Sequence, residues 1–193
     1  AGGTVKNINR GDKRKFLSIE IEISQNEEFI DFDMGSSQDE IKNTLINSGL
    51  WNVFRTRPFN RTPNISSSPE ALFINCCDTN PLSVDPYEII NIDKDSFDKG
   101  LETIKQLFDC DIHLTYQNNN FDNTLSGINY HQFTGPHPAG LVGTHISKIH
   151  PVNLNSKVWT ANFQDIISIG YLKKNKKIKT TKIISLGGPA VFE

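Results

Sequence analysis

One short stretch of the sequence concentrates residue types that can do chemistry. GPHPAGLVGTH, residues 135–145, contains Gly135, His137, Gly140 and His145. Glycine lets a backbone approach a ligand closely, proline fixes the chain direction, and imidazole is the commonest proton carrier or metal ligand near neutral pH. The composition predicts a loop shaped for contact.

A nucleotide site is the first chemistry to consider for this loop. Dinucleotide folds place their glycines in the tight turn between a strand and a helix, where backbone N–H groups meet the pyrophosphate. Here Gly135, Gly140 and Gly143 follow a GxxxxGxxG spacing, without the Lys-Ser/Thr of a P-loop, and Pro136 and Pro138 remove two donors. The spacing therefore favours a structural turn over phosphate binding.

A metal site is the second possibility. His131, His137, His145 and His150 lie within twenty residues, but their spacings do not place a pair on one helical face. No cysteine or carboxylate lies between them. The sequence therefore predicts no metal site, and it leaves His137 and His145 as candidate hydrogen-bond donors to a carbonyl group.

Arginines and an aromatic residue gather in RTRPFNR, residues 55–61. Arg55, Arg57 and Phe59 are candidates for a subunit interface, because planar guanidinium groups pair well with carboxylates of a partner. A solvated basic loop is an equally open interpretation.

Two carboxylates follow a strand-like run, in CDTNPLSVDP. Asp78 and Asp85 would lie where α/β proteins usually bind ligands. Asp and Asn near proline are also ordinary turn formers, and we favour this structural interpretation.

The cysteines and the overall composition exclude several classes of protein. Cys76, Cys77 and Cys110 form no CxxC pair, which argues against a disulfide framework, a zinc site or an iron-sulfur cluster, and spacing yields no catalytic triad. With 193 residues, 36% hydrophobic composition and a net charge of -2, the chain can bury a core but offers no concentrated basic patch for nucleic acid. No apolar run approaches the roughly 20 residues of a membrane helix. The first residues have neither an initiator Met nor a signal core, so we expect an internal piece of a longer protein.

The elements that position these residues can be read in order. Residues 2–8 and the alternating FLSIEIEI, residues 16–23, predict a hairpin with a half-buried strand. Ser37 and Glu40 form a capping box that begins a helix, and Gly49 ends it. The proline-rich residues 50–69 predict no regular element.

The middle of the chain predicts an α/β fold. An apolar strand at 71–76, a helix from about 96 to 108 and an alternating strand at 111–117 make a right-handed βαβ unit. A polar loop at 118–129 leads into the motif at 135–145. After it, the pattern predicts strands at 158–163, 165–170 and 178–186, with a lysine-rich turn at 171–177.

Several of these motifs together resemble a known family. RTRPF, DTNPLSVDP, TGPHPAGLVGTHI and VWTANFQDIISIGYL, followed by GGPAV, occur in the order found in the A subunit of the Na⁺-translocating NADH:quinone oxidoreductase of bacterial membranes. The resemblance covers nearly the whole chain. It implies the end of a barrel-sandwich domain at 1–35, a Rossmann-like domain at 36–134, and a connecting loop with a partial β-grasp domain at 135–193.

The resemblance also implies a function. The family is a peripheral component on the cytoplasmic face of the bacterial inner membrane, in a six-subunit pump where NADH reduces ubiquinone and Na⁺ is moved. FAD, FMN, riboflavin and iron-sulfur belong to other subunits, and the membrane-embedded B subunit is the expected partner. This chain would carry no redox cofactor or catalytic residue, be inactive alone, and contribute Gly135, His137, Gly140 and His145 to quinone binding. The alternatives are a flavin- or NADH-binding electron-transfer subunit of an Rnf or complex I type, and a ligand-free scaffold.

Overall fold

The computed structural model describes residues 2–25, 29–119, 121, 125–188 and 191, and the chain divides into two compact units, residues 1–31 and 32–193. Residues 26–28, between the predicted hairpin and the predicted first helix, and residues 120 and 122–124 of the expected polar loop lie outside the described residues.

The first unit is the predicted hairpin. Strands β1 (Gly3–Arg10) and β2 (Phe16–Ile23) pair antiparallel, and a 3₁₀ turn (Asp12–Arg14) joins them. The prediction that β2 is half-buried was wrong for this unit, because Ile19 and Ile21 are exposed by 47% and 46%. Two strands alone have no second layer that covers an apolar face.

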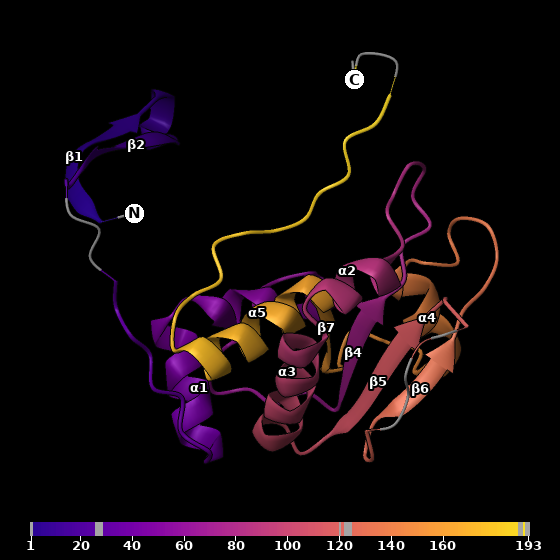
Figure 1. Cartoon of the computed structure of the whole chain (residues 1–193). Helices are drawn as coiled ribbons and strands as arrows, with labels where there is room; N and C mark the ends of the chain where they lie inside the picture. The colour runs from indigo at the N-terminus through magenta and orange to yellow at the C-terminus, as the bar shows by residue number, and fades with distance from the viewer. Residues whose placement is uncertain (1, 26–28, 120, 122–124, 189–190, 192–193) are drawn as a thin grey trace. The chain divides into compact units, whose positions relative to one another are not determined.

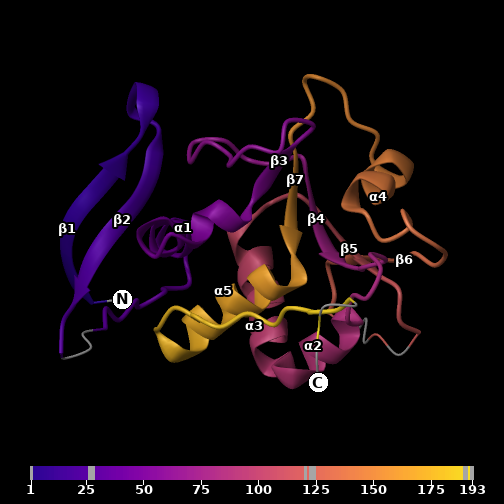
Figure 2. The ribbon, with the colours of Figure 1, turned by 90° about the horizontal axis from the view of Figure 1, so that it is seen from above.

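The second unit is built on a five-stranded mixed sheet in the order β3-β7-β4-β5-β6 (Figure 1; β3 is labelled in Figure 2). Edge strand β3 runs antiparallel to β7, and the other neighbours are parallel. The strands are β3 (Arg55–Arg57), β4 (Ala71–Cys76), β5 (Asp111–Tyr116), β6 (Asn129–Gln132) and β7 (Val158–Asn162). The helices are α1 (Gln38–Asn47), 3₁₀ helix η2 (Leu50–Val53), α2 (Pro86–Ile92), α3 (Lys94–Leu107), α4 (Val142–Ile149) and α5 (Phe163–Asn175). The unit is therefore α/β, as predicted.

The two faces of this sheet differ in chemistry. Alternate residues of the central strands, such as Leu72, Ile74, Leu114 and Trp159, are buried in the main core with side chains of α1, α2, α3 and α5. Figure 2 shows α4 on the opposite side of the sheet from α2, α3 and α5. The smaller core on the α4 side centres on Ala71, Phe73, Ile146 and Val158.

Local signals predicted several of these elements correctly. The strands at 71–76 and 111–116 and the helix between them are confirmed. Ser37 and Glu40 form the capping box at the start of α1, and Gly49 follows it with a left-handed φ of 79°.

The predicted strand at 165–170 was wrong. This segment lies in α5, which Asn162 caps by accepting a hydrogen bond from the backbone N–H of Gln164. The apolar run fits either a strand or a helix. Close packing of α3 against α5 favours the helix, because a Cβ at Gly170 would overlap the carbonyl oxygen of Ser96.

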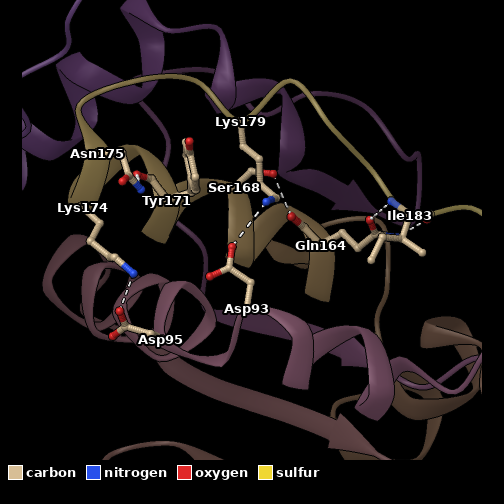
Figure 3. A network of polar contacts seen from close by, with 9 residues as sticks. All are labelled: Asp93, Asp95, Gln164, Ser168, Tyr171, Lys174, Asn175, Lys179 and Ile183. Atoms are coloured by element: carbon tan, nitrogen blue, oxygen red, sulfur yellow. Dashed lines mark hydrogen bonds and ion pairs between the residues drawn. The ribbon is translucent and has the colours of Figure 1, made fainter.

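The lysine-rich turn expected at 171–177 and the strand expected at 178–186 were also wrong. Residues up to 175 continue α5, and Lys176 ends it in a left-handed conformation. Residues 178–186 form no strand, and they run along α5 instead (Figure 3). There the side-chain amide of Gln164 donates to Ile183 O (2.8 Å) and accepts from Ile183 N (3.0 Å). With these strands absent, the expected β-grasp domain is not confirmed.

Two strands and two α-helices of the described residues were missed because each is short or follows proline, and 3₁₀ helix η2 was missed as well. Strand β3 lies in the segment judged too proline-rich, and β6 begins at the end of the expected polar loop. Helix α2 begins at Pro86, after an Asp85 cap, and α4 begins at Val142, so the last four residues of the 135–145 stretch expected to be a loop are helical. Short elements carry little periodic signal, and tertiary pairing decides them.

Candidate functional site

The α4 face of the sheet carries a row of polar side chains across four strands. The strand register places Asn162 of β7 beside Asn75 of β4, Asn75 beside Thr115 of β5, and Thr115 beside His131 of β6. Alternation places this row on the same face as Phe73, which packs in the α4-side core. The row lies at the carboxyl ends of β7, β4 and β5.

This edge also contains the switch point of the sheet. From β4 the chain proceeds to β5 and β6 on one side, and β7 then pairs on the other side of β4. Open α/β sheets bind ligands in the crevice outside the carboxyl ends at such a point. The part of the polar row on β4 and β7 is therefore a candidate ligand site.

Gly140 anchors the motif of residues 135–145 to the loop after β4. Its N–H donates to Thr79 Oγ1 (3.0 Å), and its carbonyl accepts from Asn75 Nδ2 (3.2 Å). A Cβ at Gly140 would lie 2.7 Å from the backbone nitrogen of Thr79. Glycine is needed here because two backbone segments approach each other closely.

His145 supports this loop from inside the fold. It lies on α4 with a fully buried side chain, and Nε2 is 2.7 Å from the carbonyl oxygen of Ala139, to which it donates. Its ring packs against Phe133 with centroids 4.1 Å apart. Burial lowers the pKa of His145, which favours the neutral ring. His145 is therefore part of the packing that supports the loop from inside.

His137 and Gly135 are the exposed members of the motif. His137 Nδ1 lies 3.3 Å from Thr79 Oγ1, and its side chain is exposed. Gly135 has a φ of 127°, which side-chain-bearing residues rarely adopt, and is exposed as well. Of the two candidate histidines, His137 is the one that a ligand can reach.

A pair of histidines on the same face was missed from the sequence. His113 Nδ1 lies 3.0 Å from His131 Nε2, and Phe73 packs on the His113 ring at 4.8 Å. Burial lowers the pKa of both imidazoles, and the charge of His131 lowers that of His113 further. The alternation of residues 111–117 put Ile112, Leu114 and Tyr116 on one face of the strand and His113 on the other. That pattern was the sequence signal that could have placed His113 on the α4 face.

Arg55 and Arg57, two of the interface candidates, line a pocket beside the polar row. Arg55 is next to Thr160 and Arg57 next to Val158 in the β3–β7 ladder. The pocket has a volume of about 430 Å³. Its lining includes polar groups from four segments: Arg55, Arg57, Asn60, Asn75, Thr160, Asn162, Asp165 and Lys182.

Phe59, the third interface candidate, is placed differently. Its ring is 60% exposed and carries the Arg61 guanidinium 5.8 Å from its centroid. The three candidates are therefore divided between a pocket and an exposed loop.

The carboxylates of the loop after β4 serve local structure. Asp78 Oδ1 accepts from the backbone N–H of Asn80 (2.9 Å). Asp85 caps α2 through Tyr87 N (2.9 Å) and accepts from Asn118 Nδ2 (2.8 Å).

In the part of the chain that the structure describes, no three His, Cys, Asp or Glu side chains are placed to hold a metal ion. Within the same part, no helix is long and apolar enough to cross a membrane.

Comparisons with known proteins return the family that the motifs resemble. Residues 36–178 match the family model of the NqrA second alpha/beta domain. Three curated proteins, each named as the A subunit of Na⁺-translocating NADH-quinone reductase, are similar over almost the whole chain. They come from Glaesserella parasuis (40% identity over 99% of this chain and 45% of the relative), Haemophilus influenzae strain PittEE (41%, 100% and 45%) and Neisseria meningitidis strain MC58 (40%, 99% and 44%). The chain thus spans a little under half the length of these relatives. With a family model matching most of its length, the chain belongs to the NqrA family and contains the second alpha/beta domain of that family.

Proposed function

We propose that this chain is part of the A subunit of a Na⁺-translocating NADH–quinone reductase. Identity of about 40% to proteins of that name, sustained from one end of the chain to the other, carries the proposal. The chain would act in a complex peripheral to the membrane on its cytoplasmic face, with the membrane-embedded B subunit as its neighbour. FAD, FMN, riboflavin and iron-sulfur would be held by other subunits, which leave this chain a non-redox role.

The sheet supports a Rossmann-like description of the α/β unit. Four parallel strands, helices on both faces and a switch point between β4 and β7 are the features of that architecture. Strand β7 pairs with β4, so we extend the proposed domain from residue 134 to about residue 178.

Within the complex, we assign residues 135–145 to quinone binding. His137 is exposed next to Thr79, so its imidazole can donate a hydrogen bond to a quinone carbonyl. Leu141, 42% exposed, offers an apolar contact to the ring on the same loop. Gly140 and His145 hold the loop in place, and Gly135 supplies its turn.

The assembled complex provides the test of this role. Replacement of His137 by alanine should raise the KM for ubiquinone by about tenfold, as expected for the loss of one hydrogen bond, with assembly unchanged. His150→Ala, beyond the loop at the end of α4, is the matched control and should leave KM within twofold. An azido-quinone should label residues 135–145, and excess quinone should suppress that labelling. Unchanged KM and labelling confined to other subunits would reject the role.

A docking role rests on Phe59. An exposed aromatic ring on a proline-containing loop is a common interface anchor. Phe59→Ser should lower the yield of assembled complex, while the complex that does form keeps its quinone KM. If the yield stays at the wild-type level, Phe59 does not dock the chain onto its neighbours.

The scaffold and electron-transfer alternatives give different results. A ligand-free scaffold would lose assembly in docking variants and show no quinone-specific labelling. A Rossmann-type NADH or FAD site carries glycines in the loop after its first parallel strand, and residues 77–85 contain no glycine, which speaks against a dinucleotide site of that type. A stoichiometric flavin absorbance band in the purified full-length protein would establish this alternative.

A further inference from the structure

The pocket lined by Arg55 and Arg57 has more positive than negative charge. Lys182 Nζ forms an ion pair with Asp165 Oδ1 at 2.9 Å, which balances that lysine. Within the described residues, neither arginine has a carboxylate within 4.0 Å. Two guanidinium charges therefore face the pocket without a counterion from this part of the chain.

Arg57 is the less accessible of the two. Its side chain is partly buried, and Nε is shielded from solvent without a hydrogen-bond partner among the described residues. Burial lowers the pKa of Arg57, which reflects the cost of removing the cation from water. A guanidinium in such a place is stabilised by an acceptor that enters the pocket.

The remaining groups around the pocket complement these arginines. Arg55 Nη1 donates to Thr62 Oγ1 at 3.1 Å, the one side-chain hydrogen bond it makes in the described part of the chain. Asn162 uses Oδ1 to cap α5 (3.0 Å to Gln164 N), so its NH₂ group is left as a donor at the rim. Asn60 brings a further amide group from the loop after β3. Hydrogen-bond donors therefore outnumber acceptors among the groups that line the pocket.

We propose that this pocket binds an oxyanion, a phosphate or carboxylate group of a small soluble ligand. Arg57, Arg55 and the amide of Asn162 would provide the contacts. The planar guanidinium fork matches two oxygens of such a group, and the pocket lies at the switch point between β4 and β7. A volume of about 430 Å³ holds more than one phosphate group. Val142 of the 135–145 stretch also lines this pocket, but the three proposed contact residues lie outside that stretch. Substitutions of Arg55 and Arg57 therefore test anion binding without changing His137.

Calorimetric titration of the full-length protein with inorganic pyrophosphate, and with inorganic phosphate, is the direct test. We expect saturable binding that weakens at least tenfold in Arg57→Gln and Arg55→Gln, and less strongly in Arg57→Lys, which keeps the charge but loses the fork. Arg61→Gln is the matched control, because Arg61 is exposed nearby and does not line the pocket. It should bind within twofold of wild type.

Equal binding by wild type, Arg57→Gln and Arg55→Gln would overturn the proposal, as would no binding at all. Thermal midpoints without anion show whether each variant folds. If Arg57→Gln is destabilised, the exposed Arg55→Gln decides the outcome.

Phenylglyoxal labelling of arginines in the assembled complex distinguishes a soluble ligand from a neighbouring protein chain. We expect Arg57 to be modified in the complex and protected at least fivefold by pyrophosphate. Modification that is blocked by assembly alone, whatever the anion, would overturn the proposal, because a carboxylate of another protein chain would then occupy the pocket.

Discussion

The backbone N–H of Gly140 donates to the hydroxyl of Thr79 across 3.0 Å, and this bond joins two loops that are 61 residues apart in sequence. One loop leaves β4 and the other precedes α4. Because His137 also lies next to Thr79, at 3.3 Å, the position of the candidate ligand contact depends on this bond.

Gly140→Ala should displace the loop. Its Cβ would lie 2.7 Å from Thr79 N, a backbone atom that cannot rotate away, so we expect a loss of about 1–3 kcal/mol in unfolding free energy. Urea denaturation measures this loss. Gly143→Ala is the control, since nothing lies within 4 Å of a Cβ there, and within helix α4 alanine should be neutral or stabilising by up to ~1 kcal/mol. Equal effects of the two substitutions would contradict the loop geometry.

The contact between α3 and α5 should tolerate alanine in place of glycine even less well than Gly140 does. A Cβ at Gly170 would overlap Ser96 O, and one at Gly100 would overlap Ile166 O. Either alanine forces the helices apart and opens the main core, so we expect more than about 3 kcal/mol of destabilisation, or no soluble protein. Lys99→Ala, on the exposed side of α3, should change stability by less than ~0.5 kcal/mol. A stable Gly170→Ala variant would show that the helices are farther apart than described.

The histidine pair should make stability depend on pH. Burial lowers the pKa of His113 and of His131 below 6.5, so the native imidazoles stay neutral where the unfolded ones take up protons. The stability that this provides is fully present above pH 6.5. It is lost as the pH falls from 6.5 through the native pKa values. Urea denaturation between pH 5 and 8 should show this loss.

Imidazole NMR titration tests the same pair residue by residue. Both midpoints should lie below 6.5. The midpoint of His113 should rise in His131→Gln, which removes a neighbouring positive charge, and fall in Asp111→Asn, since Asp111 raises it. Midpoints at or above 6.5 in the wild type would disprove the burial of the pair.

The chain around Ile183, which follows α5, should loosen from the helix when the Gln164 side chain is removed. Gln164→Ala deletes both hydrogen bonds to Ile183 and leaves the Lys179–Asp93 ion pair nearby (Figure 3). The Lys182–Asp165 ion pair and the hydrogen bond from Val84 N to Ser185 Oγ also remain. Hydrogen exchange at the Ile183 amide, whose N–H donates to Gln164, should become at least tenfold faster, while the unfolding midpoint hardly moves. Asn175→Ala removes a side-chain hydrogen bond to Tyr171 O within α5, and as the control it should leave the Ile183 amide protected. Unchanged exchange in Gln164→Ala would mean that other contacts hold the segment.

Elements with strong local signals were predictable. The capping box of Ser37 and Glu40, the buried strand at 71–76 and the helix that follows Asp93 each depend on residues within a few positions of one another. The candidate loop was recognisable by composition, but the different roles of His137 and His145 were not. Their difference is burial, which depends on where α4 packs.

The sequence by itself determined the α/β class, the first βαβ unit and, through its ordered motifs, the family. Only the tertiary structure decided that 165–170 is helical, that β7 pairs between β3 and β4, and that Arg57 faces a pocket with Asn162. Those outcomes depend on pairings between residues about a hundred positions apart, such as Arg55 with Thr160. Local propensity does not encode such pairings, because the free energy that selects them comes from burying the helical layer against one face of the completed sheet.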